Sequence, residues 1–192
     1  MAETDCGAVV LAAGRAKRMG RPKVLLPWRG RPLLAHILET LSQVGLCPVV
    51  VVTGPDTPSL EPLRAQFGIE LVYHAHARAG MGGSLAAGVR ALRERVCAAL
   101  ICLGDQPTLS VEALRAVVAH ARAGRPVVPL YRGWQGHPVL FPAHLFPELR
   151  VCTGDVGGRA VLARHAPLEV NLDLPLPADV DTPDDYHRLV TC

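Results

Sequence analysis

Short apolar segments alternate with amphipathic segments along the first two thirds of the chain. The apolar segments are rich in Val, Ile and Leu, and Gly or Pro residues stand near their ends. Near-continuous apolar runs of this length are typical of strands buried on both faces, as in a parallel sheet. They predict five strands, over residues 6–12, 48–54, 69–74, 98–104 and 125–131.

The segments between these strands have the spacing of helices. In the last of them, apolar residues recur at steps of three and four from Val111 to Val118, with Ser110 placed as N-cap and Gly124 as the C-terminal stop. Regular alternation of strand and helix, with right-handed crossovers, predicts a doubly wound, mostly parallel α/β sheet. The predicted helices cover residues 32–45, 58–68, 84–95 and 110–124.

The pattern changes after Tyr131, where Pro and Gly become dense. A helix is predicted over residues 157–166, an extended run over 168–174 and a terminal helix that opens at Thr182. The chain contains no internal repeat and no linker long enough to divide it. We therefore expect a single domain over residues 1–192 with an irregular C-terminal third.

The composition fits one ordinary globular domain. The chain has 192 residues, 49% of them hydrophobic and 19% charged, which excludes a disordered protein. No stretch approaches the ~20 apolar residues of a membrane span, and acids stand near the N-terminus where a secretory signal carries basic residues. The net charge of +3 is small and the basic residues are dispersed, which disfavours nucleic acid as a partner. We expect a cytoplasmic protein with no membrane partner.

Six cysteines are spread along the chain without any C-x-x-C pair. That spacing indicates neither a zinc site nor a redox motif, so we expect the cysteines to be small buried hydrophobic residues.

The loop after the first predicted strand concentrates positive charge. It reads LAAGRAKRMGRPK over residues 11–23 and holds five cations within nine positions. Ligands bind outside the carboxyl ends of strands in open α/β sheets, and exposed N–H groups beside cations suit a polyphosphate. Arg21 follows Gly20, and Ala16 stands two places after Gly14, so both the P-loop and the dinucleotide-binding fingerprint are absent. A solvated basic loop is the alternative interpretation.

Carboxylates at two distant places are candidates for a metal site opposite this loop. Asp105 ends the fourth apolar run, where a carboxylate suits Mg²⁺ bound to a triphosphate; a turn or cap role is the alternative. Near the C-terminus, Thr182, Pro183 and Asp185 form a start that resembles a capping box. That helix start leaves Asp181 without a structural explanation.

Three of these segments resemble the MobA-like nucleotidyltransferases. The loop matches the family pattern L-A-[AG]-G-x-x-x-R-[MF]-G-x-x-K, LGDQP around Asp105 resembles the family's metal-binding motif, and DVDTPDDY around Asp181 resembles its closing motif. The resemblance implies a Rossmann-like nucleotidyltransferase fold in which Asp105 and Asp181 bind Mg²⁺, while Arg18 and Lys23 offset the charge of a triphosphate. It assigns catalysis to Arg18, Lys23 and Asp105, and nucleotide binding to Leu11, Ala12, Ala13, Gly14, Arg18, Lys23, Gly82 and Ser84.

A further segment, GMGGSL at residues 80–85, resembles the part of the family that lies against the nucleobase. We expect the base between Ala12–Ala13 and Gly82, and we also place Ser84 as a helix N-cap. The LAAG form of the first motif resembles the cytidylyl-transferring branch of the family, which implies CTP as the nucleotide.

Two segments of the C-terminal third resemble those that face the pterin in molybdenum cofactor cytidylyltransferases. They are GHPVLF and GDVGGR, and the resemblance assigns substrate binding to Gln106, His137 and Asp155. Gln135 and Val156 each stand where that family usually has Arg. Both departures remove a cation that would hold a phosphorylated pterin, so they bear on the identity of the acceptor.

The resemblance implies an enzyme that moves CMP from CTP to the terminal phosphate of molybdopterin and releases pyrophosphate. Mg²⁺ is the implied cofactor, and a molybdoenzyme that receives the product is an implied partner. A transferase that uses GTP or another phosphorylated acceptor is the alternative within this class. A non-catalytic pterin carrier is the alternative outside it, whereas the missing glycine fingerprint disfavours an NAD-linked oxidoreductase.

Overall fold

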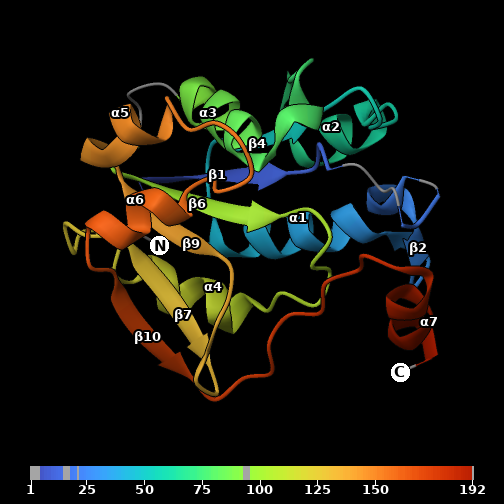
Figure 1. Cartoon of the computed structure of the whole chain (residues 1–192). Helices are drawn as coiled ribbons and strands as arrows, with labels where there is room; N and C mark the ends of the chain where they lie inside the picture. The colour runs from blue at the N-terminus through green and yellow to red at the C-terminus, as the bar shows by residue number, and fades with distance from the viewer. Residues whose placement is uncertain (1–4, 15–17, 21, 93–95, 192) are drawn as a thin grey trace.

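The computed structural model describes residues 5–14, 18–20, 22–92 and 96–191. A mixed sheet forms its centre, and helices pack on both faces of that sheet (Figure 1). All five predicted strands are present, each slightly shorter than its apolar run. The strands of this sheet are β1 (Cys6–Leu11), β4 (Val49–Thr53), β5 (Glu70–Tyr73), β6 (Ala98–Leu103), β7 (Val127–Tyr131), β8 (Trp134–Gln135), β9 (Val139–Pro142) and β10 (Leu168–Leu172).

Strand β1 lies in the middle of the sheet and runs parallel to both of its neighbours. It pairs with β4 on one side, where Ala8 is opposite Val49, and with β6 on the other, where Cys6 is opposite Ala98. The order across the sheet is β10-β7-β9-β6-β1-β4-β5. The direction in which the chain adds strands therefore reverses between β1 and β6, and such a reversal opens a crevice at the carboxyl ends of the two strands.

The sheet contains two strands that the sequence analysis did not predict, β8 and β9. Strand β9 pairs antiparallel with β6, with Ile101 opposite Val139, and it separates β6 from β7. Four residues that end at a proline are too few to show a periodicity, but pairing with β6 buries Leu140 and Phe141 completely. The mostly parallel α/β fold is confirmed, whereas the expected irregular C-terminal third holds regular elements, including β9 and β10.

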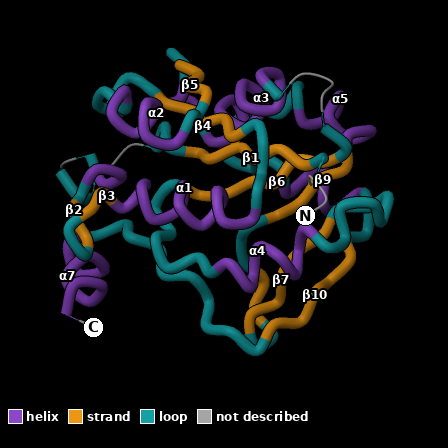
Figure 2. Tube along the Cα trace, turned by 180° about the vertical axis from the view of Figure 1, so that it is seen from behind, coloured by secondary structure: helices purple, strands orange, loops and turns teal. Residues whose placement is uncertain are grey.

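Different helices pack on the two faces of the sheet. Helices α1 and α4 pack on one face, and α3, α5 and α6 pack on the other (Figures 1 and 2). No helix within the described ranges is long and apolar enough to cross a membrane. The α-helices are α1 (Leu33–Val44), α2 (Glu61–Phe67), α3 (Met81–Ala91), α4 (Val111–Val118), α5 (Phe146–Leu149), α6 (Arg159–Arg164) and α7 (Pro183–Thr191).

The predicted start of α3 and the predicted end of α4 differ from the structure. Helix α3 begins at Met81 with Gly80 as its N-cap, so Ser84 lies inside the first turns and its predicted capping role is wrong. Gly80 has φ 126°, and a Cβ there would lie 2.4 Å from the carbonyl carbon of Gly154, so contact with a distant loop decides where α3 starts. Helix α4 ends at Val118, earlier than predicted, and short turns continue the chain to the residues before Gly124.

The predicted caps of α4 and α7 are confirmed. The Ser110 hydroxyl accepts a hydrogen bond from the amide of Ala113 at 3.1 Å. In α7 the Thr182 hydroxyl accepts from the amide of Asp185 at 3.2 Å, and the Asp185 carboxylate accepts from the amide of Thr182 at 2.7 Å. This reciprocal pair is the capping box, and it fixes the chain direction just after Asp181.

The cysteines follow the prediction in part. Cys6 and Cys102 are buried in the core, and Cys97 and Cys152 are half-buried. Cys47 is exposed, because it stands in the short connection between α1 and β4.

Gly88 allows α3 to pack closely on the sheet, and its replacement by Ala is expected to destabilise the protein. A Cβ at this position would lie 2.3 Å from Cγ1 of Val9 and 2.9 Å from Cγ2 of Val52. Overpacking costs about 1–3 kcal/mol and exceeds the gain of about 1 kcal/mol in helix propensity, so we expect a net loss of about 1–2 kcal/mol in unfolding free energy. Urea unfolding measures this loss.

Gly83→Ala in the same helix is the matched control. Its Cβ would meet the ring of His74 at 2.6 Å from Nε2, the far end of a side chain that can rotate away. We expect Gly83→Ala to be neutral or slightly stabilising, and equal losses in both variants would contradict the proposed role of close packing at Gly88.

Candidate active site

Two carboxylates from distant parts of the chain meet at one lysine. Asp105 follows the end of β6, Asp181 precedes α7, and Lys23 is the first residue of the short 3₁₀ helix η1 (Lys23–Leu25). The ammonium group of Lys23 donates a hydrogen bond to Oδ2 of Asp105 and another to Oδ1 of Asp181, the latter at 2.7 Å. Lys23 of the predicted cationic loop and both predicted acids therefore lie together, while Arg15, Lys17 and Arg21 of that loop lie outside the described residues.

Arg18 extends this cluster toward the solvent. Its Nη2 donates to Oδ2 of Asp181 at 3.0 Å, and its side chain is 68% exposed, against 12% for Lys23. Burial by itself would lower the pKa of Lys23, but the two carboxylates raise it above its ordinary value. The hydrogen bond from Lys23 in turn lowers the pKa of Asp181, so the ion pair is charged on both sides at neutral pH.

A set of hydrogen bonds holds the segment before Asp181 against the turn after β6. The amide of Val180 donates to the carbonyl of Asp105 at 3.1 Å, and Val180 is fully buried. The amide of Ala178 donates to the Thr108 hydroxyl at 2.8 Å. These contacts fix the position of Asp181 beside Asp105, although the two residues are far apart in the sequence.

The two carboxylates suit a divalent cation. Oδ1 of Asp105 is buried and has no hydrogen-bond partner among the described residues. Mg²⁺ prefers oxygen ligands and usually takes one or two carboxylates together with phosphate oxygens and water. The described residues contain no group of three or more His, Cys, Asp or Glu side chains placed to hold an ion. A cation bound here would therefore take its remaining ligands from the substrate and from water.

A pocket of about 440 Å³ lies beside this cluster, at the carboxyl ends of β1 and β6. It brings together most of the residues predicted to bind the nucleotide. The predicted site residues that line it are Leu11, Ala12, Ala13, Gly14, Lys23, Ser84, Asp105 and Asp155.

Two predicted residues are placed differently from the expectation. Asp155, expected to face the acceptor, lines this smaller pocket beside Ser84. Gly82 does not line it; its amide donates to the carbonyl of Gly154 at 2.8 Å, and a Cβ there would lie 2.6 Å from the carbonyl oxygen of Thr153. Gly82 thus allows α3 to approach the loop before α6, and its contact with the nucleobase stays a prediction.

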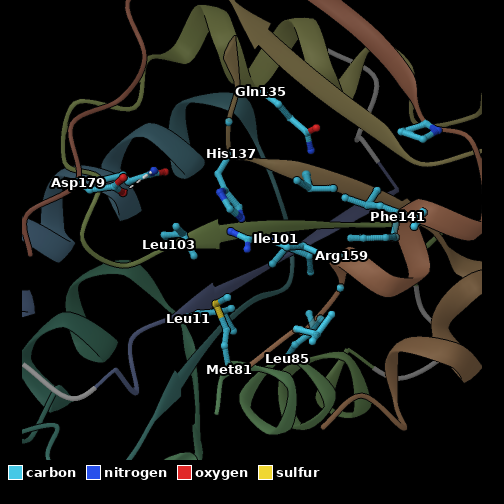
Figure 3. Close-up of a pocket in the computed structure, with 18 of the residues that line it drawn as sticks. Leu11, Met81, Leu85, Ile101, Leu103, Gln135, His137, Phe141, Arg159 and Asp179 are labelled. Carbon is cyan, nitrogen blue, oxygen red and sulfur yellow. Dashed lines mark hydrogen bonds between the residues drawn. The ribbon is translucent and has the colours of Figure 1, made fainter. Parts of the chain in front are cut away.

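A larger pocket of about 650 Å³ adjoins the first one, because Leu11, Met81 and Leu103 line both. Figure 3 shows Gln135 and His137 on one side of this larger pocket and Met81 and Leu85 on the other. Most of its lining is apolar. The polar and charged residues of its lining are Gln106, Gln135, His137, Arg159 and Asp179.

Gln106 joins the larger pocket to the carboxylate cluster. It is 3% exposed, and its Nε2 donates to Oδ1 of Asp179 at 2.8 Å, the bond drawn as a dashed line in Figure 3. An ionised carboxylate only accepts hydrogen bonds, which fixes the orientation of the amide. Its Oε1 is left buried and without a partner among the described residues. Gln106, predicted to bind substrate, therefore lies directly between the pocket and the segment that carries Asp181.

His137 is half-buried in the wall of the larger pocket. Its carbonyl accepts a hydrogen bond from the Tyr131 hydroxyl at 2.6 Å. Burial lowers the pKa of His137 to about 4, with the nearby Asp105 acting in the opposite direction and Arg159 in the same one. The imidazole is therefore neutral at pH 7 and presents one donor and one acceptor to the pocket.

The pKa of His137 predicts a loss of stability in mild acid. Because the folded-state pKa lies below the unfolded value, the unfolded chain binds the proton more tightly, and stability falls as the pH drops from about 6.5 toward 4. Because of this group, we expect the unfolding free energy to fall by about 2 kcal/mol when the pH is lowered from about 7.5 to about 5. Urea unfolding at the two pH values, with wild type and His137→Asn, measures the difference.

The control for this prediction is His120→Asn, which removes an exposed histidine. The unfolding free energy of His120→Asn should change between the two pH values by as much as that of the wild type. For His137→Asn this change should be about 2 kcal/mol smaller. An unchanged pH dependence in His137→Asn would show that this imidazole is not held neutral by the fold.

Sequence reasoning missed two arginines that line the pockets. Arg159 stands at the N-terminus of α6 and is the one cation in the lining of the larger pocket within the described residues. It closes the GDVGGR segment, so the motif contained the signal. Arg78 lines the smaller pocket and pairs with Asp56 at 2.5 Å; it stands two residues before the GMGGSL segment, whose resemblance to the nucleobase region was the available signal.

Both departures from the family pattern lie at the larger pocket. Gln135 and Val156 line it, and Val156 is 58% exposed. The usual cations would thus have stood at the wall and mouth of this pocket.

The chain is similar along nearly its whole length to curated bacterial proteins. It is 35% identical to the nicotine blue oxidoreductase of Paenarthrobacter nicotinovorans, and the alignment covers 99% of this chain and 100% of that one. It is 29% identical to the molybdenum cofactor cytidylyltransferase of Escherichia coli K12, over 97% of this chain and 95% of that one.

The fold is similar to that of a mycobacterial protein. The crystal structure of Rv0371c from Mycobacterium tuberculosis H37Rv has a TM-score of 0.86 and 31% identity over 100% of both chains. The complex of that protein with manganese has a TM-score of 0.84 at 31% identity, over 98% of this chain and 99% of that one. The sequence model of the MobA-like NTP transferase domain matches residues 8–169. Because this match spans the cationic loop, Asp105 and both pockets' central strands, the chain belongs to the MobA-like NTP transferase family and is a nucleotidyltransferase.

Proposed function

We propose that this nucleotidyltransferase moves CMP from CTP to the terminal phosphate of a molybdopterin-type acceptor, with Mg²⁺ as its cofactor and pyrophosphate as the second product. The observation that carries the proposal is that two pockets, which share Leu11, Met81 and Leu103 in their linings, adjoin each other beside one charged cluster. Lys23 and Asp105 line the smaller pocket, while Gln106, next to Asp105, lines the larger one. Two substrates bound in these pockets would meet at the Asp105–Lys23–Asp181 cluster.

The reaction joins two polyanions, so the site has to offset negative charge. An oxygen of the acceptor phosphate forms a bond to the α-phosphorus of CTP, and the bond from that phosphorus to the leaving pyrophosphate breaks. The attacking oxygen is already ionised, so alignment and electrostatic stabilisation suffice and no protein base is needed. A divalent ion held by Asp105 and Asp181 supplies positive charge next to the reacting phosphates.

The other residues of the site bind the triphosphate, the nucleotide and the acceptor. Arg18 and Lys23 offset charge on the triphosphate, and Lys23 lines the pocket in which we place it. The backbone of residues 11–14 carries the nucleotide, since the small residues there allow close approach to the chain. In the larger pocket, apolar walls suit a flat heterocycle, and neutral His137 and Gln106 offer hydrogen bonds to its edge.

The similarity to the Escherichia coli cytidylyltransferase supports CTP and a molybdenum cofactor acceptor. The positions of Gln135 and Val156 favour a second candidate within the same class, a transferase whose acceptor is held with fewer cations. A molybdoenzyme that receives the product is a proposed partner.

Mass spectrometry of the product tests the proposal. The purified protein is incubated with molybdopterin, magnesium and CTP, GTP or ATP in parallel, and we expect a CMP adduct of the pterin and pyrophosphate only with CTP. A product with GTP, or with another phosphorylated acceptor alone, would replace the specific proposal by the second candidate. Pterin binding without any adduct would favour a carrier. Since one relative is named an oxidoreductase, a parallel assay of NADPH oxidation checks for that activity.

A further inference from the structure

Lys23 occupies the space between the two carboxylates to which we assign the metal ion. Its ammonium group contacts Oδ2 of Asp105 and Oδ1 of Asp181 at once, and its side chain is only 12% exposed. Arg18 donates a hydrogen bond to Oδ2 of Asp181. Of the four carboxylate oxygens, three are thus bonded to cations of the protein, and the fourth, Oδ1 of Asp105, is buried without a partner among the described residues.

A divalent ion bound to these oxygens competes with Lys23. Two positive charges within a few ångströms of each other in a partly buried site repel strongly. Oδ2 of Asp105 and Oδ1 of Asp181 already accept hydrogen bonds from the ammonium group of Lys23. An ion that bridges Asp105 and Asp181 therefore requires the lysine to leave.

The ammonium group of Lys23 has a second place to lie, in the smaller pocket. Lys23 lines that pocket together with the loop residues Ala12, Ala13 and Gly14. A lysine has a flexible four-carbon stem and a compact charge, so its ammonium group can turn from the carboxylates toward a polyphosphate bound there. A triphosphate carries more negative charge than the two carboxylates together, which favours the turn.

We propose that Lys23 is an internal counter-ion that holds the metal site closed until a polyphosphate draws it away. This inference rests on the proposed function, because it takes Asp105 and Asp181 as the metal ligands. It follows that nucleotide and metal bind with positive coupling, and that each raises the affinity for the other by the same factor. The free protein binds divalent ions weakly, and the metal site forms only when the donor nucleotide is present.

Manganese binding to the protein without nucleotide tests this proposal. Free Mn²⁺ is followed by electron paramagnetic resonance during titration of the wild type, Lys23→Gln and Lys23→Arg. We expect Lys23→Gln to bind Mn²⁺ at least about tenfold more tightly than the wild type, because the competing charge is gone. Lys23→Arg keeps the charge and should bind as weakly as the wild type.

Arg18→Gln is the matched control for net charge. It removes one positive charge that also contacts Asp181, but it leaves the bridge between the two carboxylates intact. Because Arg18 is mostly exposed and screened, we expect its loss to change Mn²⁺ affinity by less than about threefold.

Thermal unfolding gives a second readout that does not depend on the spectroscopy. Without Lys23, two carboxylates face each other without their shared cation, so Lys23→Gln should be less stable than the wild type and should recover stability when Mn²⁺ is added. If Lys23→Gln folds only with Mn²⁺ present, the proposal is supported in the same way.

The outcomes separate this inference from the proposed function. Equal Mn²⁺ affinities in the wild type and Lys23→Gln, both abolished by Asp105→Asn, would overturn the counter-ion role and leave the metal site standing. Tight binding in Lys23→Gln that neither Asp105→Asn nor Asp181→Asn weakens would overturn both.

Discussion

Asp105→Asn is expected to lower the kcat of pyrophosphate release by at least about 10³-fold while the protein stays folded, a loss of about 4 kcal/mol of transition-state stabilisation. Asn keeps the shape of the side chain but removes the negative charge that would hold a divalent ion. The carbonyl and amide contacts of the turn after β6 do not involve the side chain, so the fold should persist. Continuous measurement of pyrophosphate with CTP and magnesium gives kcat, and circular dichroism checks folding.

Asp184→Asn is the control for this result. Asp184 is an exposed carboxylate in the first turn of α7, a short distance along the chain from Asp181 but outside the cluster. Its replacement should leave kcat within about twofold of the wild type. Near-normal turnover by Asp105→Asn in magnesium would defeat the assignment of this carboxylate to the metal.

Lys23→Ala is expected to lower kcat/KM for CTP by about 10²–10³-fold, because the triphosphate that we place in the smaller pocket would lose a half-buried cation of the pocket's lining. The same variant should bind Mn²⁺ more tightly than the wild type in the absence of nucleotide. Opposite changes in activity and metal affinity are the signature that distinguishes this lysine from Asp105, whose loss lowers both. Steady-state kinetics at saturating magnesium and the manganese titration measure the two quantities.

Lys23→Arg separates charge from geometry at this position. Arg keeps the charge, but its planar fork replaces a compact ammonium group, and we expect an intermediate kcat/KM. A Lys23→Ala variant with wild-type kinetics would contradict the assignment of this residue to the triphosphate.

Local patterns were sufficient for most of the secondary structure. The five strands follow from apolar runs that have to be buried on both faces, and the caps at Ser110 and Thr182 follow from side chains that bond to the next turn of the same helix. The start of α3 could not be predicted in this way. Ser84 has the right chemistry for a cap, but the contact of Gly80 and Gly82 with the loop at residues 153–155 makes α3 begin earlier.

In the candidate site, too, some residues could be predicted from local sequence patterns and others depend on tertiary packing. The loop of residues 11–23 and the strand-end position of Asp105 are local features, so the sequence could predict a polyphosphate site and a metal site from them. The placement of Asp155 at the smaller pocket was not predictable, since it depends on how the loop before α6 packs against α3. Arg78 reaches the same pocket only through tertiary packing.

By itself, the sequence determined five of the strands and the helices that alternate with them along the chain, and the kinds of charged groups this protein carries, because hydrophobic period and side-chain chemistry are properties of neighbouring residues. Only the tertiary structure decided that Lys23 stands between two carboxylates that follow it by 82 and 158 residues, and that two adjoining pockets lie beside this cluster. Such distances depend on the order of strands across the sheet and on the hydrogen bonds that hold the segment before Asp181 to the turn after β6, and no local pattern contains them.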